Sequence, residues 1–189
     1  MIVVFRCTGE RRYAVEAQRA GFPNVMMNPA PGYDPLIPHD MMHLVVEAQL
    51  GLRRGIFGQL AAGGGTFQVV VKQDENAREL ARTRRRVAAR GKKSMKAGRD
   101  ECLQSERATY ICLQEWRARS SSRDEQKQAK KMADQAKSVR GAAGSKESHD
   151  LNKEKIDEIC KHLDQLSARW SSLKVGDSMA VSWPDLSVS

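Results

Sequence analysis

The sequence has few of the features that assign a protein to a class at first sight. Only 5 % of its 189 residues are aromatic, and none of its four cysteines belongs to a CxxC pair. The N-terminus has an apolar run of five residues, MIVVF, before charged residues begin, so we expect neither a signal peptide nor a membrane span. Cysteines without a disulfide pattern are typical of a reducing compartment, and we therefore expect a cytoplasmic protein with free thiols.

Sequence motifs with an established chemistry are also scarce. The glycines of AAGGG lack the lysine of a Walker loop and the spacing of a dinucleotide fingerprint. No serine lies in a nucleophile elbow, and no helix-turn-helix, RNA-binding or zinc-finger signature occurs. These absences remove the usual grounds for assigning a nucleotide-binding protein or a serine hydrolase, and they leave function to be inferred from two other segments.

Strand-like patterns occur at both ends of the chain. The segment YAVEAQ alternates as a half-buried strand does, and its neighbours are rich in β-branched residues. The predicted strands cover about residues 2–7, 13–18, 25–27, 66–72 and 179–183. Because the backbone groups of a lone strand would lack partners, we expect the last strand to rejoin an antiparallel sheet formed near the N-terminus. The predicted fold class is α+β.

Helical patterns occupy most of the rest of the chain. The predicted helices cover about residues 38–50, a short apolar segment in RGIFGQLAA, and residues 74–90, 99–118, 123–140 and 149–170. The segment GAAGSKES is predicted to be a flexible break. Three parts follow: an α+β core at residues 1–77, a basic helical insertion at 78–145, and an amphipathic helix with the C-terminal strand at 146–189.

The segment IPHDMMHLVVEAQLG contains the most specific candidate site. Pro38 suits the start of a helix, and Asp40 suits its first turn. On a helix His39 and His43 lie one turn apart on the same face, where both imidazoles can bind one divalent metal ion such as Zn²⁺. The sequence predicts these two histidines as metal ligands and Asp40 as the group that handles the proton of a bound water.

Glu47 lies too far along the same helix to complete this ligand set. A rise of about 1.5 Å per residue separates positions 39 and 47 by roughly 12 Å. We therefore predict that Glu47 supports catalysis from the outer shell by orienting His43. The alternative is an ordinary helix, in which His43 and Glu47 form an i,i+4 pair and His39 is a local cap.

Two resemblances follow from these residues. HDMMH is similar to the HExxH motif of zincin metallopeptidases over five residues, with an aspartate in place of the glutamate. The longer pattern P-H-D-x-x-H-x-x-x-E, followed by LGL, RGIFG and AAGG, resembles a family of small bacterial proteins without an assigned activity. This second resemblance covers the N-terminal third and the tail VGDSMAVSWP, and it implies a compact bacterial domain without a mechanism.

The second candidate site is diffuse. The net charge of the chain is +9, and residues 78–140 alone contain nineteen Lys/Arg against eight Asp/Glu, a local excess of +11. Such a segment can neutralise nucleic-acid phosphates or meet an acidic protein. The predicted phosphate-contacting residues are Arg82, Arg85, Arg86, Arg90, Lys92 and Lys93. Because no aromatic residue occurs between Phe67 and Tyr110, stacking on unpaired bases is not expected.

The sequence leaves open what these two sites do. One hypothesis is a metal-dependent hydrolase that uses His39 and His43. The rival is a non-enzymatic binding module whose basic helices meet nucleic acid or another acidic partner. The basic segment is also compatible with a solvated helical face or with partial disorder, and a purely structural role remains a further alternative.

Overall fold

The computed structural model describes residues 1–71 and 76–188 and shows an α+β fold, as predicted. In this part of the chain five strands form one antiparallel sheet with the order β4-β3-β2-β1-β5. The strands are β1 (Ile2–Gly9), β2 (Arg12–Gln18), β3 (Val25–Ala30), β4 (Gln68–Val69) and β5 (Ser178–Ser182).

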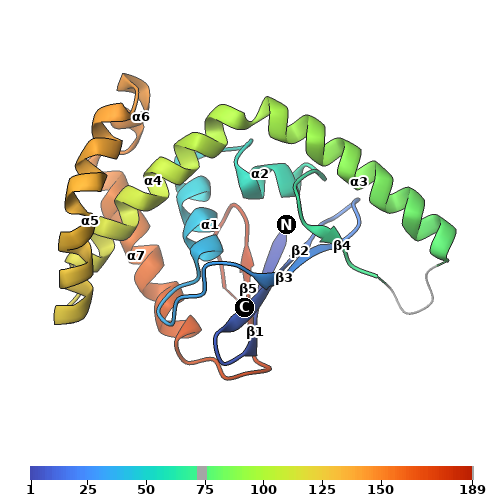
Figure 1. Ribbon diagram of the computed structural model, residues 1–189, viewed down its shortest axis with the longest axis horizontal. Helices are drawn as coiled ribbons and strands as arrows, with labels where there is room; N and C mark the ends of the chain where they lie inside the picture. Colours follow the sequence, from blue (N-terminus) through green and yellow to red (C-terminus); the bar gives the residue numbers. More distant parts are fainter. Residues whose placement is uncertain (72–75, 189) are drawn as a thin grey trace.

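The C-terminal strand pairs with the N-terminal strand, so the prediction that it rejoins the sheet is confirmed. Ile2 lies opposite Ser182, and Arg6 lies opposite Ser178. The face predicted to be buried on the second strand is confirmed, because Tyr13, Val15 and Ala17 are fully buried, although Ala14 on the other face is buried as well. The ends of the chain therefore build the middle and one edge of the sheet, and β4 forms the other edge (Figure 1).

The helices lie beside and above this sheet (Figure 1). They are α1 (His39–Leu50), α2 (Ile56–Ala61), α3 (Ala77–Ala97), α4 (Arg99–Ala118), α5 (Arg123–Ala142), α6 (Ser145–Asp150) and α7 (Lys153–Trp170). In Figure 1, α3 and α4 form a bent rod across the molecule, with α3 reaching beyond the sheet on one side and α4 packed with α5 and α7 on the other. None of the described helices combines the length and the apolar character needed to cross a bilayer.

Several predicted segments differ from the observed ones, and one of them is the helix predicted at residues 149–170, which is divided between α6 and α7. The predicted strand at residues 66–72 is limited to Gln68–Val69 within the described residues, and position 72 lies outside them. The helix predicted to end at residue 90 continues to Ala97, because Gly91 fits directly against the Gly65 carbonyl oxygen; a Cβ there would be 2.2 Å from that oxygen. The predicted break in GAAGSKES is present but short, since α5 runs to Ala142 and α6 begins at Ser145; its flexibility stays a prediction.

Helix α1 lies at the centre of the fold. Every residue from Asp40 to Glu47 is buried, because α2, α4 and α7 all pack around this helix. A helix that is enclosed on all sides is expected to be apolar all round. Asp40, His43 and Glu47 depart from that rule, and each of them must find polar partners inside the protein.

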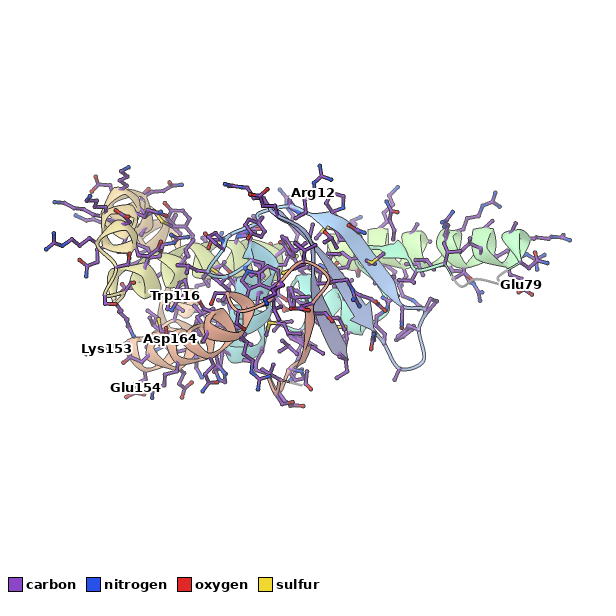
Figure 2. All side chains as sticks on the ribbon, turned by 90° about the horizontal axis from the view of Figure 1, so that it is seen from below. Arg12, Glu79, Trp116, Lys153, Glu154 and Asp164 are labelled. Atoms are coloured by element: carbon purple, nitrogen blue, oxygen red, sulfur yellow. The ribbon has the colours of Figure 1, made fainter. Side chains whose placement is uncertain are left out.

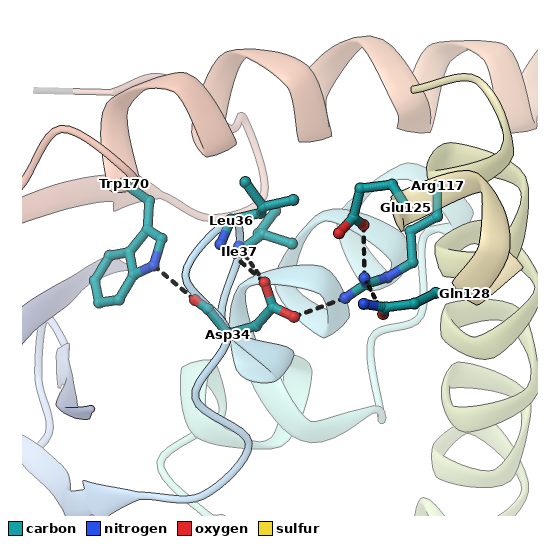
Figure 3. Close-up of polar contacts among 7 residues, drawn as sticks. All are labelled: Asp34, Leu36, Ile37, Arg117, Glu125, Gln128 and Trp170. Carbon is teal, nitrogen blue, oxygen red and sulfur yellow. Dashed lines mark hydrogen bonds and ion pairs between the residues drawn. The ribbon is translucent and has the colours of Figure 1, made fainter. Parts of the chain in front are cut away.

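The proline-rich segment before α1, residues 31–38, is held in place by a partly buried ion pair (Figure 3). The Asp34 carboxylate accepts hydrogen bonds from the backbone N–H groups of Leu36 and Ile37, and it pairs with Arg117 of α4 at 2.6 Å. The indole of Trp170 in α7 donates to the Asp34 carbonyl oxygen at 3.0 Å. These contacts tie the approach to α1 to two other helices and thereby fix where α1 begins.

Candidate metal centre

Local signals place His39 and His43 on α1 as the sequence predicts. Pro38 is the N-cap residue, with φ −61° and ψ 145°, and Gly51 ends the helix in the left-handed conformation at φ 65°. The backbone N–H of His39 donates to the Gly32 carbonyl oxygen at 3.1 Å. Gly32 has φ 71° and lies so close that a Cβ would be 2.7 Å from the His39 Cβ. The proline-rich segment thus rests directly on the first histidine.

The two imidazoles converge, and a carboxylate from another helix joins them. The Nε2 atoms of His39 and His43 are 3.0 Å apart, and the Glu106 Oε2 of α4 is 3.5 Å from the His43 Nε2. One ligand atom from each of these three residues lies within 4.8 Å of the others. Tetrahedral Zn²⁺ with bonds of about 2.0–2.1 Å separates its ligand atoms by roughly 3.3 Å. The distances from the His43 Nε2 to the His39 Nε2, 3.0 Å, and to the Glu106 Oε2, 3.5 Å, lie just below and just above that value. This cluster can therefore hold a metal ion.

A chain of hydrogen bonds fixes the orientation of His43. The Ser105 hydroxyl of α4 donates to the Glu47 Oε1 at 2.9 Å. Having used its proton there, the Ser105 oxygen accepts from the His43 Nδ1 at 2.8 Å. The proton on Nδ1 leaves Nε2 as the ligating nitrogen. This arrangement matches the second-shell support that metal-binding histidines have in known sites.

Glu47 is itself fixed by the start of α2. Its carboxylate accepts hydrogen bonds from the backbone N–H groups of Ile56 and Phe57 at 2.7 and 2.8 Å. A Cβ on Gly55 would lie 2.4 Å from the Glu47 carboxyl carbon, so this approach requires glycine. Burial raises the pKa of Glu47, and the donated hydrogen bonds oppose that rise. Glu47 is connected to His43 through Ser105, and its outer-shell role toward a metal stays a prediction.

Asp40 lies outside the cluster of three ligands. The phenol of Tyr13 on β2 contacts the Asp40 Oδ2 and the Pro31 carbonyl oxygen. Burial raises the pKa of Asp40, while the hydrogen bond to Tyr13 and the nearby histidines lower it. In this structure Asp40 therefore connects α1 to the sheet and to the proline-rich segment, and its catalytic role stays a prediction.

Glu106 was not identified from the sequence. It lies 63 positions after His43 in a helix of ordinary polar composition, and no local pattern pairs that helix with α1. One signal was available: Ser105 and Thr109 are four residues apart and would share a helix face. Both hydroxyls do face the His43 Nδ1, at 2.8 and 3.3 Å. Only the packing of α1 against α4 shows that the face of α4 with Ser105 and Thr109 contacts His43.

The charge state of the cluster follows from its surroundings. Desolvation, followed by the neighbouring His43, lowers the pKa of His39 and favours its neutral form. Contact with His43 lowers the pKa of Glu106, against an opposing effect of desolvation. His43 is 1 % exposed, whereas the Glu106 side chain is 58 % exposed. Two imidazole nitrogens and one carboxylate oxygen thus converge, a set of donor atoms that suits a divalent metal ion.

A small cavity lies beside the cluster. It has a volume of about 210 Å³, and its walls include His39, Met42 and Leu113. The Arg117–Asp34 ion pair forms another part of its lining (Figure 3). Solvent therefore reaches the cluster along His39 and along the exposed Glu106.

The residues predicted to contact nucleic acid all lie on α3. All six are exposed, and they are Arg82, Arg85, Arg86, Arg90, Lys92 and Lys93. They occupy a different part of the molecule from the His39–His43–Glu106 cluster, which involves α1 and α4. The two candidate sites are therefore separate structural features.

Comparison of the chain with protein-family models, with curated proteins and with solved structures gives no match. The resemblance to the small bacterial family and to the zincin motif therefore stays a prediction. The arguments about function rest on the geometry described above.

Proposed function

We propose that this protein is a metal-dependent hydrolase with a single divalent ion held by His39, His43 and Glu106. One observation carries the proposal: the three ligand atoms converge from two helices while a buried relay from Glu47 through Ser105 fixes the inner histidine. If His43 only formed an ion pair with Glu106, the buried hydrogen bonds from Glu47 through Ser105 that orient its ring would have no function. Two histidines and one carboxylate form a ligand set used by catalytic zinc sites.

The open side of the cluster favours catalysis over a purely structural ion. Structural zinc sites are usually closed by four protein ligands, whereas catalytic sites keep a position for water or substrate. Here three residues contribute ligand atoms, and Glu106 faces solvent. A bound divalent ion would lower the pKa of water toward about 7 and polarise a carbonyl or phosphoryl oxygen.

The protein residues then have distinct tasks. His43 is held rigidly by Ser105, and His39 forms the boundary between the cluster and the 210 Å³ cavity, where a group flanking the scissile bond can bind. Glu106 contributes one carboxylate oxygen to the ligand set, and its second oxygen can accept a proton from water. Asp40 keeps the first turn of α1 in position through Tyr13.

Metal analysis of protein purified without added chelator tests this proposal. We expect about one zinc-type ion per chain in the native protein and less than a tenth of that in His43→Ala and Glu106→Gln, because each removes a ligand. Ser105→Ala keeps all three ligands but frees His43 to rotate, and we expect metal affinity to fall about 10- to 100-fold. Hydrolysis of a nitrophenyl ester or phosphoester should stop on chelation and return with the ion.

The matched control is His149→Ala, which removes an exposed histidine on α6 outside the cluster. This variant should keep the metal content and the activity of the native protein. Circular dichroism should show that all variants are folded. Native protein without stoichiometric metal would end the proposal, and so would a His43→Ala, Glu106→Gln double variant that keeps its ion.

A further inference from the structure

Helix α3 concentrates the positive charge of the molecule. It contains nine Lys/Arg and one acid, Glu79. All nine cations are exposed, and none of them forms an ion pair with another described residue. They are Arg78, Arg82, Arg84, Arg85, Arg86, Arg90, Lys92, Lys93 and Lys96. The positive charge of this helix is therefore not balanced within the described part of the protein.

These cations share one side of the helix. At 100° per residue, all of them except Arg84 fall within an arc of roughly 160°. The opposite side contains the buried residues Val87 and Gly91, which face the body of the protein. Helix α3 has 21 residues, so this cationic face is about 30 Å long. We use the term cationic face for these eight residues.

The positive charges on the cationic face repel one another. Arg78, Arg82, Arg86 and Arg90 follow one another at i,i+4 spacing, where like charges repel each other and destabilise a helix. The first turns have little packing to offset this cost, since only Leu80 and Thr83 are half-buried there. Figure 2 shows Glu79 at the far end of the helix, well away from the rest of the molecule. A polyanion bound along this face would turn the repulsion into attraction.

We propose that the cationic face of α3 binds the phosphate backbone of a nucleic-acid duplex. A B-form duplex has about one negative charge per 1.7 Å, or roughly 18 phosphates along 30 Å, which is enough to serve all eight cations. Five of the eight are arginines, which bind phosphate through two parallel N–H groups. The cationic face shares no residue with the metal centre, so duplex binding and metal-dependent hydrolysis can be tested independently.

Other polyanions fit this face less well. Binding of single strands usually combines cations with exposed aromatic rings for base stacking. Helix α3 has no aromatic residue, and of the two rings beside it Phe67 is buried and Phe22 is covered by the Arg90 guanidinium. A helix that lies on a membrane inserts a large apolar face into the lipid. The apolar side of α3 is instead turned toward Gly65 and β4 of its own chain. A duplex needs only a long row of exposed cations, and that is what the helix presents.

The clefts beside α3 extend the same surface. One cleft of about 610 Å³ separates α3 from residues 65–69, and Arg84 and Lys92 line it. A second cleft of about 210 Å³ on the other flank is lined by Phe22, Arg86 and Arg90, with the Arg90 guanidinium 4.9 Å from the centre of the Phe22 ring. Cations therefore continue from the exposed face into both flanking clefts, where the sugar–phosphate strands of a duplex can run.

Fluorescence anisotropy with a labelled 24-base-pair duplex of mixed sequence, as DNA and as RNA, tests the proposal. The variant Arg82→Gln, Arg85→Gln, Arg86→Gln removes three exposed cations from α3. We expect its affinity at 0.1 M salt to fall at least tenfold, and the slope of log K against log salt to decrease by about 3. The matched control Lys130→Gln, Lys131→Gln, Lys137→Gln removes the same charge from exposed positions on α5 and should stay within about threefold of the native protein.

Three outcomes would overturn the proposal. Equal loss in both triple variants would show that net charge alone drives binding, and affinity that does not change between 0.05 and 0.2 M salt would exclude phosphate contacts. Tighter binding to vesicles containing phosphatidylserine than to either duplex would assign the face to a membrane. Thermal unfolding of both triple variants checks that each is folded, and Arg82→Lys, Arg85→Lys, Arg86→Lys should restore most of the salt slope.

Discussion

The arginines of α3 and a set of arginines in the region of α4 and α5 differ in where their charge is balanced. On α3 nine exposed Lys/Arg have no ion-pair partner among the described residues. On α4, at the residue that follows it, and on α5, four arginines each have an acidic partner from another element or segment. The pairs are Arg107–Glu147, Arg117 with Asp34 and Glu125, Arg119–Asp157, and Arg140–Glu115. The same residue type therefore joins helices in one region and faces solvent in the other.

This difference has a physical origin. Arg117 is 6 % exposed, and a guanidinium in that position needs acidic partners to offset its lost hydration. The cations of α3 remain hydrated, so they need no partner for the protein to fold, and they stay available to an external anion. A positively charged segment can thus form ion pairs inside the protein or present a binding surface to solvent. The burial of its side chains distinguishes the two cases.

The largest expected difference in the free energy of unfolding is between a variant that lacks the paired Arg117 and one that lacks the exposed Arg85. Arg117→Ala leaves Asp34 and Glu125 without their cation in a partly buried site, and we expect a loss of about 3 kcal/mol in the free energy of unfolding. Arg85→Ala on α3 should change it by less than about 0.5 kcal/mol. Urea denaturation of both variants measures the difference. Similar values for the two would contradict the contrast drawn between the regions.

An intermediate effect is expected at two helical glycines. Gly91→Ala on α3 places a Cβ against the Gly65 carbonyl oxygen, and we expect it to destabilise the protein by about 1–3 kcal/mol as α3 moves away from the sheet. Gly141→Ala near the end of α5 meets nothing within 4 Å and should stabilise by about 0.5 kcal/mol. Thermal unfolding measures both changes. A neutral Gly91→Ala would show that the close approach does not hold α3 to the body.

The smallest effect concerns the local stability of α3. Amide hydrogen exchange should be faster for residues 78–86 than for residues 108–116 of α4, because the first turns of α3 have few buried contacts. Raising the salt from 0.05 to 0.5 M screens the arginine repulsion and should slow exchange in α3 by a few-fold. Exchange in α4 should remain unchanged or become slightly faster. Slower exchange in α3 than in α4 at low salt would count against this account.

Local sequence signals predicted much of the candidate site. Pro38 and Gly51 mark the ends of α1, and the i,i+4 spacing of His39 and His43 brings their Nε2 atoms to 3.0 Å. The outer-shell position of Glu47 followed from the rise of a helix, which needs no tertiary information. The connecting residue Ser105 and the third ligand Glu106 did not follow, because both depend on how α4 crosses α1.

Local patterns in the chain were enough to predict the α+β class, the strands β1 and β2, the return of β5 to the sheet, and the helix that contains both histidines. These features depend on periodicity, on proline and glycine, and on the need of each strand for a partner, all of which act over short stretches of chain. The tertiary structure alone decided which carboxylate meets the histidines and which arginines are balanced by acids. Such contacts join residues that are far apart in the chain, and no local pattern specifies the packing that brings them together.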